Sequence, residues 1–325
     1  MYEEDVPFAN PLMEPSSMRE LSLILATVGR TTELNRLFDS LAAQTFHDFE
    51  IVVVDQNSDE RLHTILERAR CLGLVIRHLR HSPPNLALAR NAGLNIAAGQ
   101  WMGFPDDDCW YAPDTLARII LRTRRSDRPQ GVICRWVEQD APLPAGLLSW
   151  ERSSRFRDFP VSSITLFFER SLISRIGGFD ARLGVGQWFG AGEETDIVLR
   201  ALRDGATLAH EPNANVHHRV EPVIPAATRI ARRYALLRAR GTGAMYAKHR
   251  LPLWVIIRGL LSPILKPLSR GRLGAELAHG VAVARGRLSG WLRWWYSTST
   301  SASASASASA SNAVDTVQLR DGHSH

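Results

Sequence analysis

Three consecutive aspartates, Asp106, Asp107 and Asp108, are the residues of this sequence best suited to chemistry. They follow directly on an apolar, strand-like run, Trp101 to Phe104. Adjacent like charges repel, so a folded protein retains such a cluster where the acids are solvated or a cation lies among them. Mg²⁺ and Mn²⁺ take oxygen ligands and are commonly held by one or two carboxylates together with substrate phosphates. Residues 104–113 alone are equally consistent with two interpretations: a metal site, or a solvated turn that caps a helix starting near Pro113.

Three further groups carry polar side chains at places where a fold can use them. Asp55 ends a β-branched run, and a carboxylate there can accept hydrogen bonds from a base or a ribose. Glu193 and Glu194 precede a helical pattern, where the helix dipole alone already favours acids. His218 ends the strand-like stretch that begins at Asn213, and imidazole is a good ligand for Mn²⁺ and a poorer one for Mg²⁺.

The elements that must position these residues alternate between two periodicities. Apolar runs at 21–27, 51–54, 74–79 and 100–104 predict strands, and helical spacing predicts helices at 34–41, 61–72 and 86–98. Such alternation indicates βαβ units around a largely parallel sheet, so the predicted class is α/β. In sheets of this kind ligands bind beyond the carboxyl ends of the strands, which is where Asp55 and the three aspartates fall.

Composition indicates four regions along the 325 residues. An N-terminal extension, 1–19, precedes the predicted α/β domain, 20–221. From 222 to 296 the patterns are helical throughout. Residues 297–325 begin with a Ser/Ala/Thr repeat that lacks core-forming side chains, and we expect a flexible linker followed by a disordered tail.

The helical region is strongly basic. Between Arg229 and Tyr296 there are 14 Lys or Arg residues and one acid, Glu276, whereas residues 1–228 carry 24 basic and 30 acidic side chains. Its most apolar stretch, 251–265, is short and interrupted by Arg258 and two prolines, so it does not predict a spanning helix. Arginines mixed with tryptophans favour an anionic membrane surface. The alternative is an ordinary basic subdomain packed on the first domain. No recognition motif accompanies the charge, so nucleic acid is not an expected partner.

The cysteines and the N-terminus bear on the compartment. Cys71, Cys109 and Cys134 show neither metal-type spacing nor a disulfide framework, which favours a reducing cytoplasm. The first residues are acidic and interrupted by prolines, unlike a signal peptide. Together with the basic helices, this predicts a cytoplasmic protein bound peripherally to the inner face of the cytoplasmic membrane.

The order of motifs resembles the family 2 glycosyltransferases, which have the GT-A fold. The resemblance extends from about Leu21 to His218. Its segments are LILATVGR (23–30), LAAQTFHDFEIVVVDQNSD (41–59), NLALARNAG (85–93), FPDDDCWYAP (104–113), GGFD (177–180) and GEETDIVLR (192–200). The sequence departs from the family at three places: the loop at 27–30 matches only through Thr27 and Arg30, Cys109 replaces a frequent acid, and Glu194 replaces an aspartate.

The resemblance implies a fold and an activity. The fold is a Rossmann-like, mixed but mainly parallel sheet with helices on both faces and a helical C-terminal extension. The activity is metal-dependent transfer of a sugar from a nucleotide-diphosphate donor to an acceptor hydroxyl, with inversion at the anomeric carbon. The basic, tryptophan-bearing helices at 222–296 would hold such an enzyme at the cytoplasmic membrane surface, near a lipid-linked acceptor, which fits assembly of a polysaccharide or a glycolipid.

The resemblance also implies a metal site for Mn²⁺ or Mg²⁺. Asp106 and Asp108 occupy the acid positions of the Asp-x-Asp motif. Asp107 fills the variable position and would contact the sugar or ribose. Counting alternate residues along the strand before it puts His218 where family members often place a histidine, as a third metal ligand or a neighbour of the site.

The remaining implied roles concern the nucleotide and the proton. Thr27 and Asp55 would line the nucleotide pocket, and Arg90 would lie near the pyrophosphate. Glu194 would be the general base, with Glu193 as the alternative. Two other functions stay open: a nucleotidyltransferase that releases pyrophosphate, and a non-catalytic relative that binds a nucleotide sugar.

Overall fold

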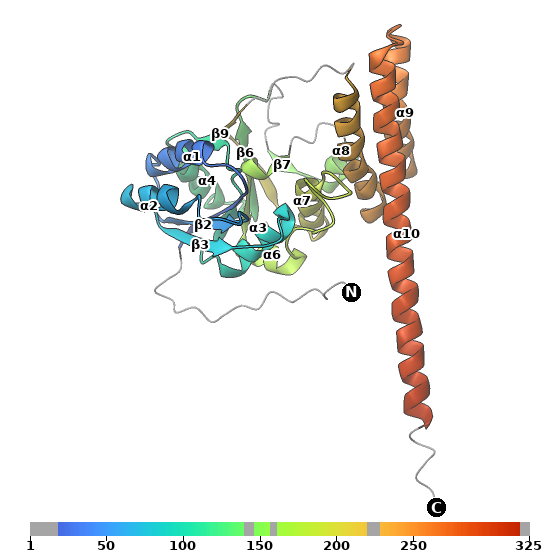
Figure 1. Ribbon diagram of the computed structural model, residues 1–325, viewed down its shortest axis with the longest axis horizontal. Helices are drawn as coiled ribbons and strands as arrows, with labels where there is room; N and C mark the ends of the chain where they lie inside the picture. Colours follow the sequence, from blue (N-terminus) through green and yellow to red (C-terminus); the bar gives the residue numbers. More distant parts are fainter. Residues whose placement is uncertain (1–18, 140–145, 157–160, 220–227, 319–325) are drawn as a thin grey trace, which may run out of the picture. The chain divides into compact units, whose positions relative to one another are not determined.

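The structure is a computed structural model that describes residues 19–139, 146–156, 161–219 and 228–318, the last 21 without their side chains. The chain forms two compact units, 1–224 and 225–325, which are described separately (Figure 1). Apart from Arg19, the predicted N-terminal extension lies outside the described residues, and so does the end of the chain from 319.

The first unit begins with alternating strands and helices. In chain order these are β1 (Leu21–Thr27), α1 (Thr32–Ala42), β2 (Phe49–Asp55), α2 (His63–Cys71), β3 (Ile76–Arg80), α3 (Leu86–Ile96) and β4 (Trp101–Gly103). Strands β1 and β2 are buried along their whole length, as continuous apolar runs in a parallel sheet should be. The predicted βαβ order is therefore present in this half of the unit.

The second half of the unit is less regular. It contains β5 (Cys109–Tyr111), α4 (Thr115–Thr123), β6 (Gly131–Trp136), β7 (Leu147–Leu148), α5 (Trp150–Ser153), the 3₁₀ turn η2 (Ser163–Thr165), β8 (Leu166–Glu169), α6 (Arg170–Ile176), α7 (Glu193–Arg203) and β9 (Leu208–His218). Within the described residues the strands make one nine-stranded sheet in the order β3-β2-β1-β4-β8-β6-β9-β5, with β7 paired to β9. Strands β3, β2, β1 and β4 are mutually parallel, whereas β8, β5 and β7 pair antiparallel.

Helices cover both faces of this sheet. Along β1, Leu23 and Leu25 enter the core beneath α1, α2 and α4, and Ile24 enters the core beneath α3, α6 and α7 (Figure 1). Alternation of side chains along a strand produces this division. The predicted fold class, a mixed and mainly parallel sheet between two helical layers with a helical C-terminal segment, is confirmed.

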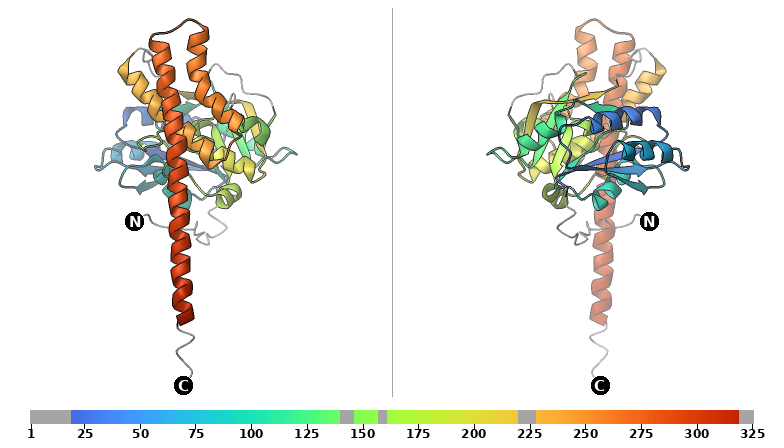
Figure 2. Two further views of the ribbon diagram at one scale, coloured as in Figure 1. Left: turned by 90° about the vertical axis from the view of Figure 1, so that its right-hand side faces the viewer. Right: turned by 90° about the vertical axis from the view of Figure 1, so that its left-hand side faces the viewer.

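The second unit consists of α8 (Arg229–Lys248), α9 (Leu253–Ser269) and α10 (Ala275–Gln318), and α9 lies beside the first part of α10 (Figure 2). Glycines let the helices approach closely. A Cβ at Gly243 of α8 would lie 2.0 Å from the Arg287 carbonyl oxygen of α10, and one at Gly290 would lie 2.0 Å from the Arg240 carbonyl oxygen of α8. Any larger side chain there would force the helices apart.

Helix α10 differs from the sequence prediction of a flexible linker. It continues through the Ser/Ala repeat to Gln318, whereas the linker was expected from Ser297. Alanine has the highest helix propensity, and extending an existing helix costs far less than starting one, so the repeat can prolong a helix begun upstream. The prediction relied on the missing core-forming residues, which bear on packing and not on backbone conformation.

Candidate functional site

The acid motif lies between two strands. Strand β4 ends at Gly103 and β5 begins at Cys109, so Asp106, Asp107 and Asp108 occupy the short connection at the carboxyl end of β4. Two strands away in the sheet, Asp55 ends β2, and its register partner Thr27 ends β1 beside β4. The sheet therefore brings the predicted metal and nucleotide residues to one edge.

Asp106 faces a buried arginine. Its Oδ1 accepts a hydrogen bond from Nη2 of Arg90 at 2.9 Å and one from the Ser163 hydroxyl at 3.2 Å. The Arg90 side chain is only 2% exposed, and its guanidinium carbon lies 5.2 Å from the centre of the Phe179 ring. Nη1 of Arg90 is buried without a hydrogen-bond partner. The predicted pyrophosphate residue is thus fixed in the core against the first acid of the motif.

Asp107 and Asp108 share a different cation. The Thr27 hydroxyl donates to Oδ2 of Asp107 at 2.7 Å, and Nη1 of Arg30 lies 3.1 Å from Oδ1 of the same residue. The same Arg30 nitrogen also pairs with Oδ2 of Asp108, whose Oδ1 lies 2.9 Å from Nε2 of His218. One positive group therefore spans the second and third acids, while the first acid contacts another.

The ionisation of these two neighbours differs strongly. Burial raises the pKa of Asp107 to about 6, against the opposing effects of the Thr27 hydrogen bond and the Arg30 charge. Burial would also raise the pKa of Asp108, but hydrogen bonds from His218 and Arg30 outweigh it and hold that pKa at about 2. Asp108 in turn raises the pKa of His218, chiefly through their hydrogen bond. Asp108 is therefore the more firmly ionised of the two carboxylates.

Strand register explains why His218 arrives here and His217 does not. In the antiparallel pair β5–β9, His218 stands opposite Cys109, the residue after the acid motif. His217 contacts other groups: Nδ1 lies 2.8 Å from Glu138 Oε1, and its ring stacks on Trp110 with centroids 5.3 Å apart. Only the second histidine of the pair reaches the acids.

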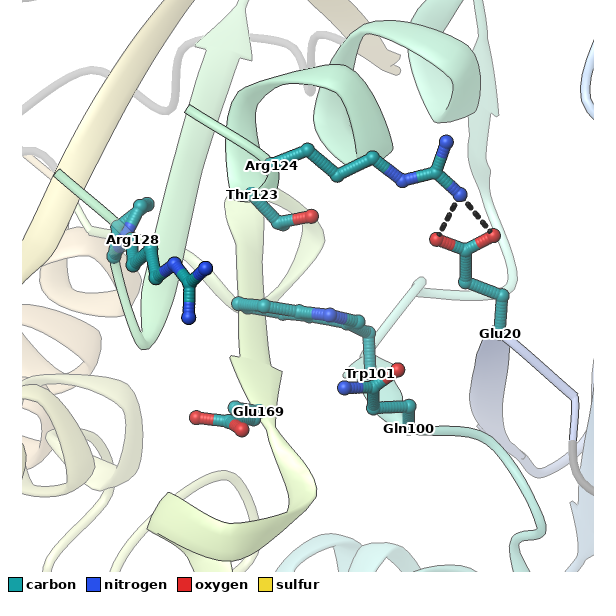
Figure 3. Close-up of a pocket in the computed structure, with 8 residues that line it drawn as sticks. Glu20, Gln100, Trp101, Thr123, Arg124, Arg128 and Glu169 are labelled. Atoms are coloured by element: carbon teal, nitrogen blue, oxygen red, sulfur yellow. Dashed lines mark hydrogen bonds and ion pairs between the residues drawn. The ribbon is translucent and has the colours of Figure 1, made fainter. Parts of the chain in front are cut away.

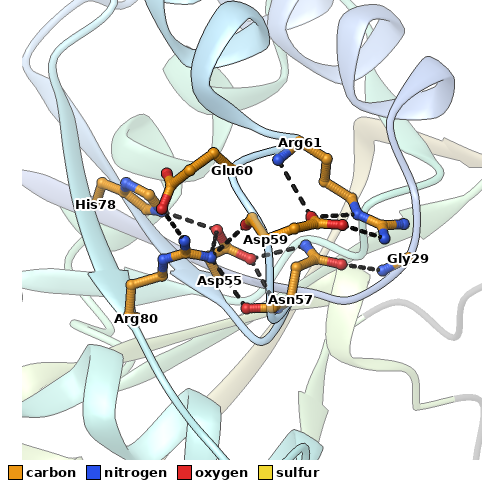
Figure 4. Close-up of polar contacts among 8 residues, drawn as sticks. All are labelled: Gly29, Asp55, Asn57, Asp59, Glu60, Arg61, His78 and Arg80. Carbon is orange, nitrogen blue, oxygen red and sulfur yellow. Dashed lines mark hydrogen bonds and ion pairs between the residues drawn. The ribbon is translucent and has the colours of Figure 1, made fainter.

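Asp55 lies at the centre of a polar cluster (Figure 4). One carboxylate oxygen accepts hydrogen bonds from the backbone and the side chain of Asn57 at 2.9 and 2.7 Å. The other lies 3.1 Å from Nε2 of His78 and 3.2 Å from Nη1 of Arg80. Asn57 also accepts from the backbone N–H of Gly29 at 2.7 Å, which ties this cluster to the turn that carries Arg30.

The two glutamates lie at the N-terminus of α7, after Gly192 with its φ of 107°. Glu193 is 3% exposed, and its Oε2 has no hydrogen-bond partner. Burial and the adjacent Glu193 charge raise the pKa of Glu194 to about 7, while Arg90 acts in the opposite direction. A base whose pKa lies near neutrality is well suited to take a proton from a hydroxyl.

Further contacts fix this helix terminus. Asp196 accepts from Nε of Arg200 at 2.9 Å, and the Arg200 guanidinium donates to the carbonyl oxygens of Ile176, Gly177 and Gly178. Asn91 exchanges two hydrogen bonds of 2.8 Å with the backbone of Phe179. The Gly-Gly-Phe-Asp segment is thus held to both α3 and α7.

The donor set is compatible with a divalent cation. Within the described residues, no group of three or more His, Cys, Asp or Glu side chains is arranged as a complete metal centre. Sites that share the ion with substrate phosphates need only one or two protein carboxylates. Asp108, with Asp107 and the imidazole of His218 beside it, supplies such a set, and Arg30 compensates its charge here.

A pocket of about 400 Å³ lies elsewhere, at the amino-terminal edge of the parallel strands (Figure 3). Its lining residues are Glu20, Gln100, Trp101, Thr123, Arg124, Arg128, Pro129 and Glu169. Arg124 donates to both carboxylate oxygens of Glu20 at 2.6 and 2.7 Å. None of its lining residues belongs to the acid motif. Ligands of α/β sheets bind at the opposite edge, so we assign the site to the acids.

Two contacts at this site were missed by the sequence reasoning. Ser163 reaches Asp106 from the turn before β8, and no motif marks it. Arg30 was noted only as an echo of the family's first loop. Its place three residues after the end of β1, just past Gly29, could have indicated that it reaches the acids from the neighbouring strand.

Comparison with known proteins agrees with this geometry. Residues 22–169 match the model of glycosyl transferase family 2. A glycosyltransferase of Haemophilus influenzae is 32% identical over 206 residues, 59% of this chain and 65% of that protein. A PGL/p-HBAD biosynthesis glycosyltransferase of Mycobacterium bovis is 38% identical over 100 residues, 30% of this chain and 39% of that protein. The segment that carries the acid motif therefore matches glycosyltransferase family 2, and the chain covers less than two thirds of the length of either of these relatives.

Solved structures show the same fold. Staphylococcus aureus TarS 1–349, crystallised with UDP-GlcNAc, superposes with a TM-score of 0.54 at 16% identity, covering 83% of this chain and 92% of that one. The mannosyltransferase PcManGT of Pyrobaculum calidifontis, in complex with GDP-Man and Mn²⁺, gives a TM-score of 0.56 at 18% identity, covering 83% and 75%. At this identity the likeness establishes the fold and leaves the substrates open.

Proposed function

We propose that the first unit transfers a sugar from a nucleotide-diphosphate donor to an acceptor hydroxyl, with inversion at the anomeric carbon and with Mn²⁺ or Mg²⁺ bound. The proposal is carried by two unlike groups: the acids at the carboxyl edge of the sheet, and a buried glutamate whose pKa reflects the nearby charges of Arg90 and Asp106. Asp107 and Asp108 would hold a cation in place of Arg30, and Glu194 has a pKa near neutrality. The nucleotide-sugar complexes of the structural relatives support the donor class.

The residues of the site would have separate roles in binding the donor and in activating the acceptor. Thr27, Asp55 and the Arg90–Asp106 pair would line the nucleotide and diphosphate side of the site. Glu194 would remove the proton from the acceptor hydroxyl as its oxygen attacks the anomeric carbon, on the face opposite the leaving nucleotide. Electrostatic stabilisation of the departing diphosphate is what a bound cation supplies.

The test is a panel of nucleotide sugars incubated with the full chain and Mn²⁺, with chromatography of the nucleotide product. Release of nucleoside diphosphate supports glycosyl transfer, and release of pyrophosphate would identify a nucleotidyltransferase instead. Asp108→Asn and Glu194→Gln should each lower turnover by at least about 100-fold. Asp39→Asn, in an exposed ion pair with Arg68, is the matched control and should leave the rate unchanged.

We also propose that the acceptor is lipid-linked and that the second unit binds an anionic membrane surface on the cytoplasmic side. Among the described residues, no helix is both long and apolar enough to cross a bilayer. Helix α9 instead exposes apolar side chains along one side while Val255 and Ile256 are buried; the exposed residues are Leu253, Trp254, Ile257, Leu261, Leu265 and Leu268. An apolar stripe on a basic helical unit fits the interface of an anionic bilayer.

Vesicle sedimentation tests this surface with the full-length protein. Wild type should bind vesicles rich in phosphatidylglycerol and not those of phosphatidylcholine alone. Leu261→Glu with Leu265→Glu should abolish binding, since both leucines are about half exposed on α9 (47% and 53%). Leu121→Glu replaces an even more exposed leucine of α4 (64%) and should bind as wild type does. Retained binding by the α9 double variant would contradict the proposal.

A further inference from the structure

The cation position between two of the aspartates is taken by a side chain of the protein itself. Nη1 of Arg30 contacts Oδ1 of Asp107 and Oδ2 of Asp108 together. We propose that Arg30 is a gate for the divalent cation: it occupies the acids while no donor is present and leaves when a metal–diphosphate complex arrives. The inference rests on the proposed function, because it concerns the same acids.

Arg30 is placed so that it can move. It follows β1 on a short turn, where Val28 is 49% exposed and Gly29 adopts a φ of 76° with open space around it. The Arg30 side chain is itself 40% exposed. By contrast, Arg90 is enclosed by the core and cannot leave Asp106 without opening it. Of these two arginines at the acid motif, only Arg30 can exchange with a ligand at small cost.

The acids do not depend on Arg30 for their position. The Thr27 hydroxyl holds Asp107, and His218 holds Asp108. Loss of the guanidinium would therefore leave both carboxylates in place with less of their negative charge compensated. Such a pair attracts a free divalent cation more strongly than a neutralised pair does.

A diphosphate gives the displaced side chain a new partner. A guanidinium matches phosphate oxygens in a two-pronged geometry, and a bound cation would repel it from the carboxylates. The exchange makes metal binding and donor binding mutually dependent. In the donor-free protein the metal must compete with Arg30 for the carboxylates. When a diphosphate is bound, the metal and Arg30 can both bind anionic groups.

The experiment measures binding of Mn²⁺ alone, by electron paramagnetic resonance of the free ion, with the full chain and no nucleotide. Arg30→Gln should bind Mn²⁺ at least about tenfold more tightly than wild type, because one positive charge is lost beside the acids. Arg30→Lys keeps that charge and should remain closer to wild type. Arg68→Gln removes one exposed positive charge near Asp39 and should change nothing. Circular dichroism confirms that each variant is folded.

A second measurement adds UDP or GDP. The diphosphate should tighten Mn²⁺ binding to wild type much more than to Arg30→Gln, which no longer has a gate to open. Equal Mn²⁺ affinity of wild type and Arg30→Gln, with binding lost in Asp108→Asn, would overturn the gate and leave the metal site standing. Absence of Mn²⁺ binding in all variants, with and without the diphosphates, would overturn the gate together with the metal-dependent function.

Discussion

The pH below which kcat/KM falls, the acid limb of its pH profile, follows from the environment of Glu194. A general base must be deprotonated, and burial together with the Glu193 charge raises the pKa of Glu194 to about 7 from an ordinary value of 4.5. Below about pH 7, kcat/KM should therefore fall about tenfold per pH unit, because that is how the charged fraction of a single carboxylate falls. With an unperturbed glutamate as the base, kcat/KM would stay unchanged down to a far lower pH.

Two substitutions should move this limb in opposite directions. Glu193→Gln removes a like charge, so the pKa of Glu194 falls and the limb shifts to lower pH by about one unit. Arg90→Met removes an opposite charge, so the limb shifts to higher pH by about one unit. Arg90→Met will also lower the maximal rate, since it releases Asp106, but the measured quantity is the position of the limb. General damage to the site cannot produce shifts of opposite sign.

The assay follows nucleoside diphosphate release at subsaturating donor and constant Mn²⁺, from about pH 5 to about pH 8.5 at fixed ionic strength. The donor is the one that the nucleotide-sugar panel selects. The reasoning is refuted if the limb stays in place in Glu193→Gln, or if both variants shift it in the same direction. Full activity of Glu194→Gln would refute the assignment of the base itself.

Three further predictions concern stability. Arg90→Met and Asp106→Asn should each lower the free energy of unfolding measured by urea titration, and the loss should be about 3 kcal/mol for the buried arginine. The double variant should lose less stability than the two single variants lose together, because the two side chains contact each other. Gly290→Val should destabilise the helical unit by at least about 2 kcal/mol in thermal unfolding, whereas Gly274→Ala, with no atom within 4 Å of the added Cβ, should not. Cys109→Asp, which restores the family's frequent acid, should cost about 3 kcal/mol in urea, because Cys109 is fully buried.

The part of the site that the sequence could predict is the part that strand patterns determine. The apolar runs before Thr27, Asp55 and Asp106 end at residues that parallel pairing brings to one edge, and this follows from local periodicity. His218 was placed by counting alternate residues along its strand. Counting residues could not identify the residue that lies opposite His218. The register that sets His218 opposite Cys109 depends on which strands pair, and this is a long-range property of the fold.

Contacts between side chains from distant parts of the chain were harder to predict from the sequence than the strand ends were. Arg90 reads as an ordinary surface charge within a helix, yet it is buried against Asp106 because α3 packs on the sheet beneath Phe179. Asp55 was expected to face a nucleotide, and both of its oxygens already contact Asn57, His78 and Arg80. Such contacts depend on the final packing, on which a single sequence carries little information.

The contacts of the acid motif bear on which carboxylates would share a cation. The resemblance implies Asp106 and Asp108 as metal ligands, with Asp107 in support. In the structure Arg30 spans Asp107 and Asp108, while Asp106 contacts the buried Arg90. A cation that replaced Arg30 would therefore meet Asp107 and Asp108 first, and its charge would lower the pKa of Asp107 from about 6 and ionise it. Binding by this pair would release a proton near pH 6, whereas a cation held by Asp108 with Asp106 would act on Asp107 only through space and should release less. Proton release measured during Mn²⁺ titration of Asp107→Asn and wild type therefore separates the two ligand pairs.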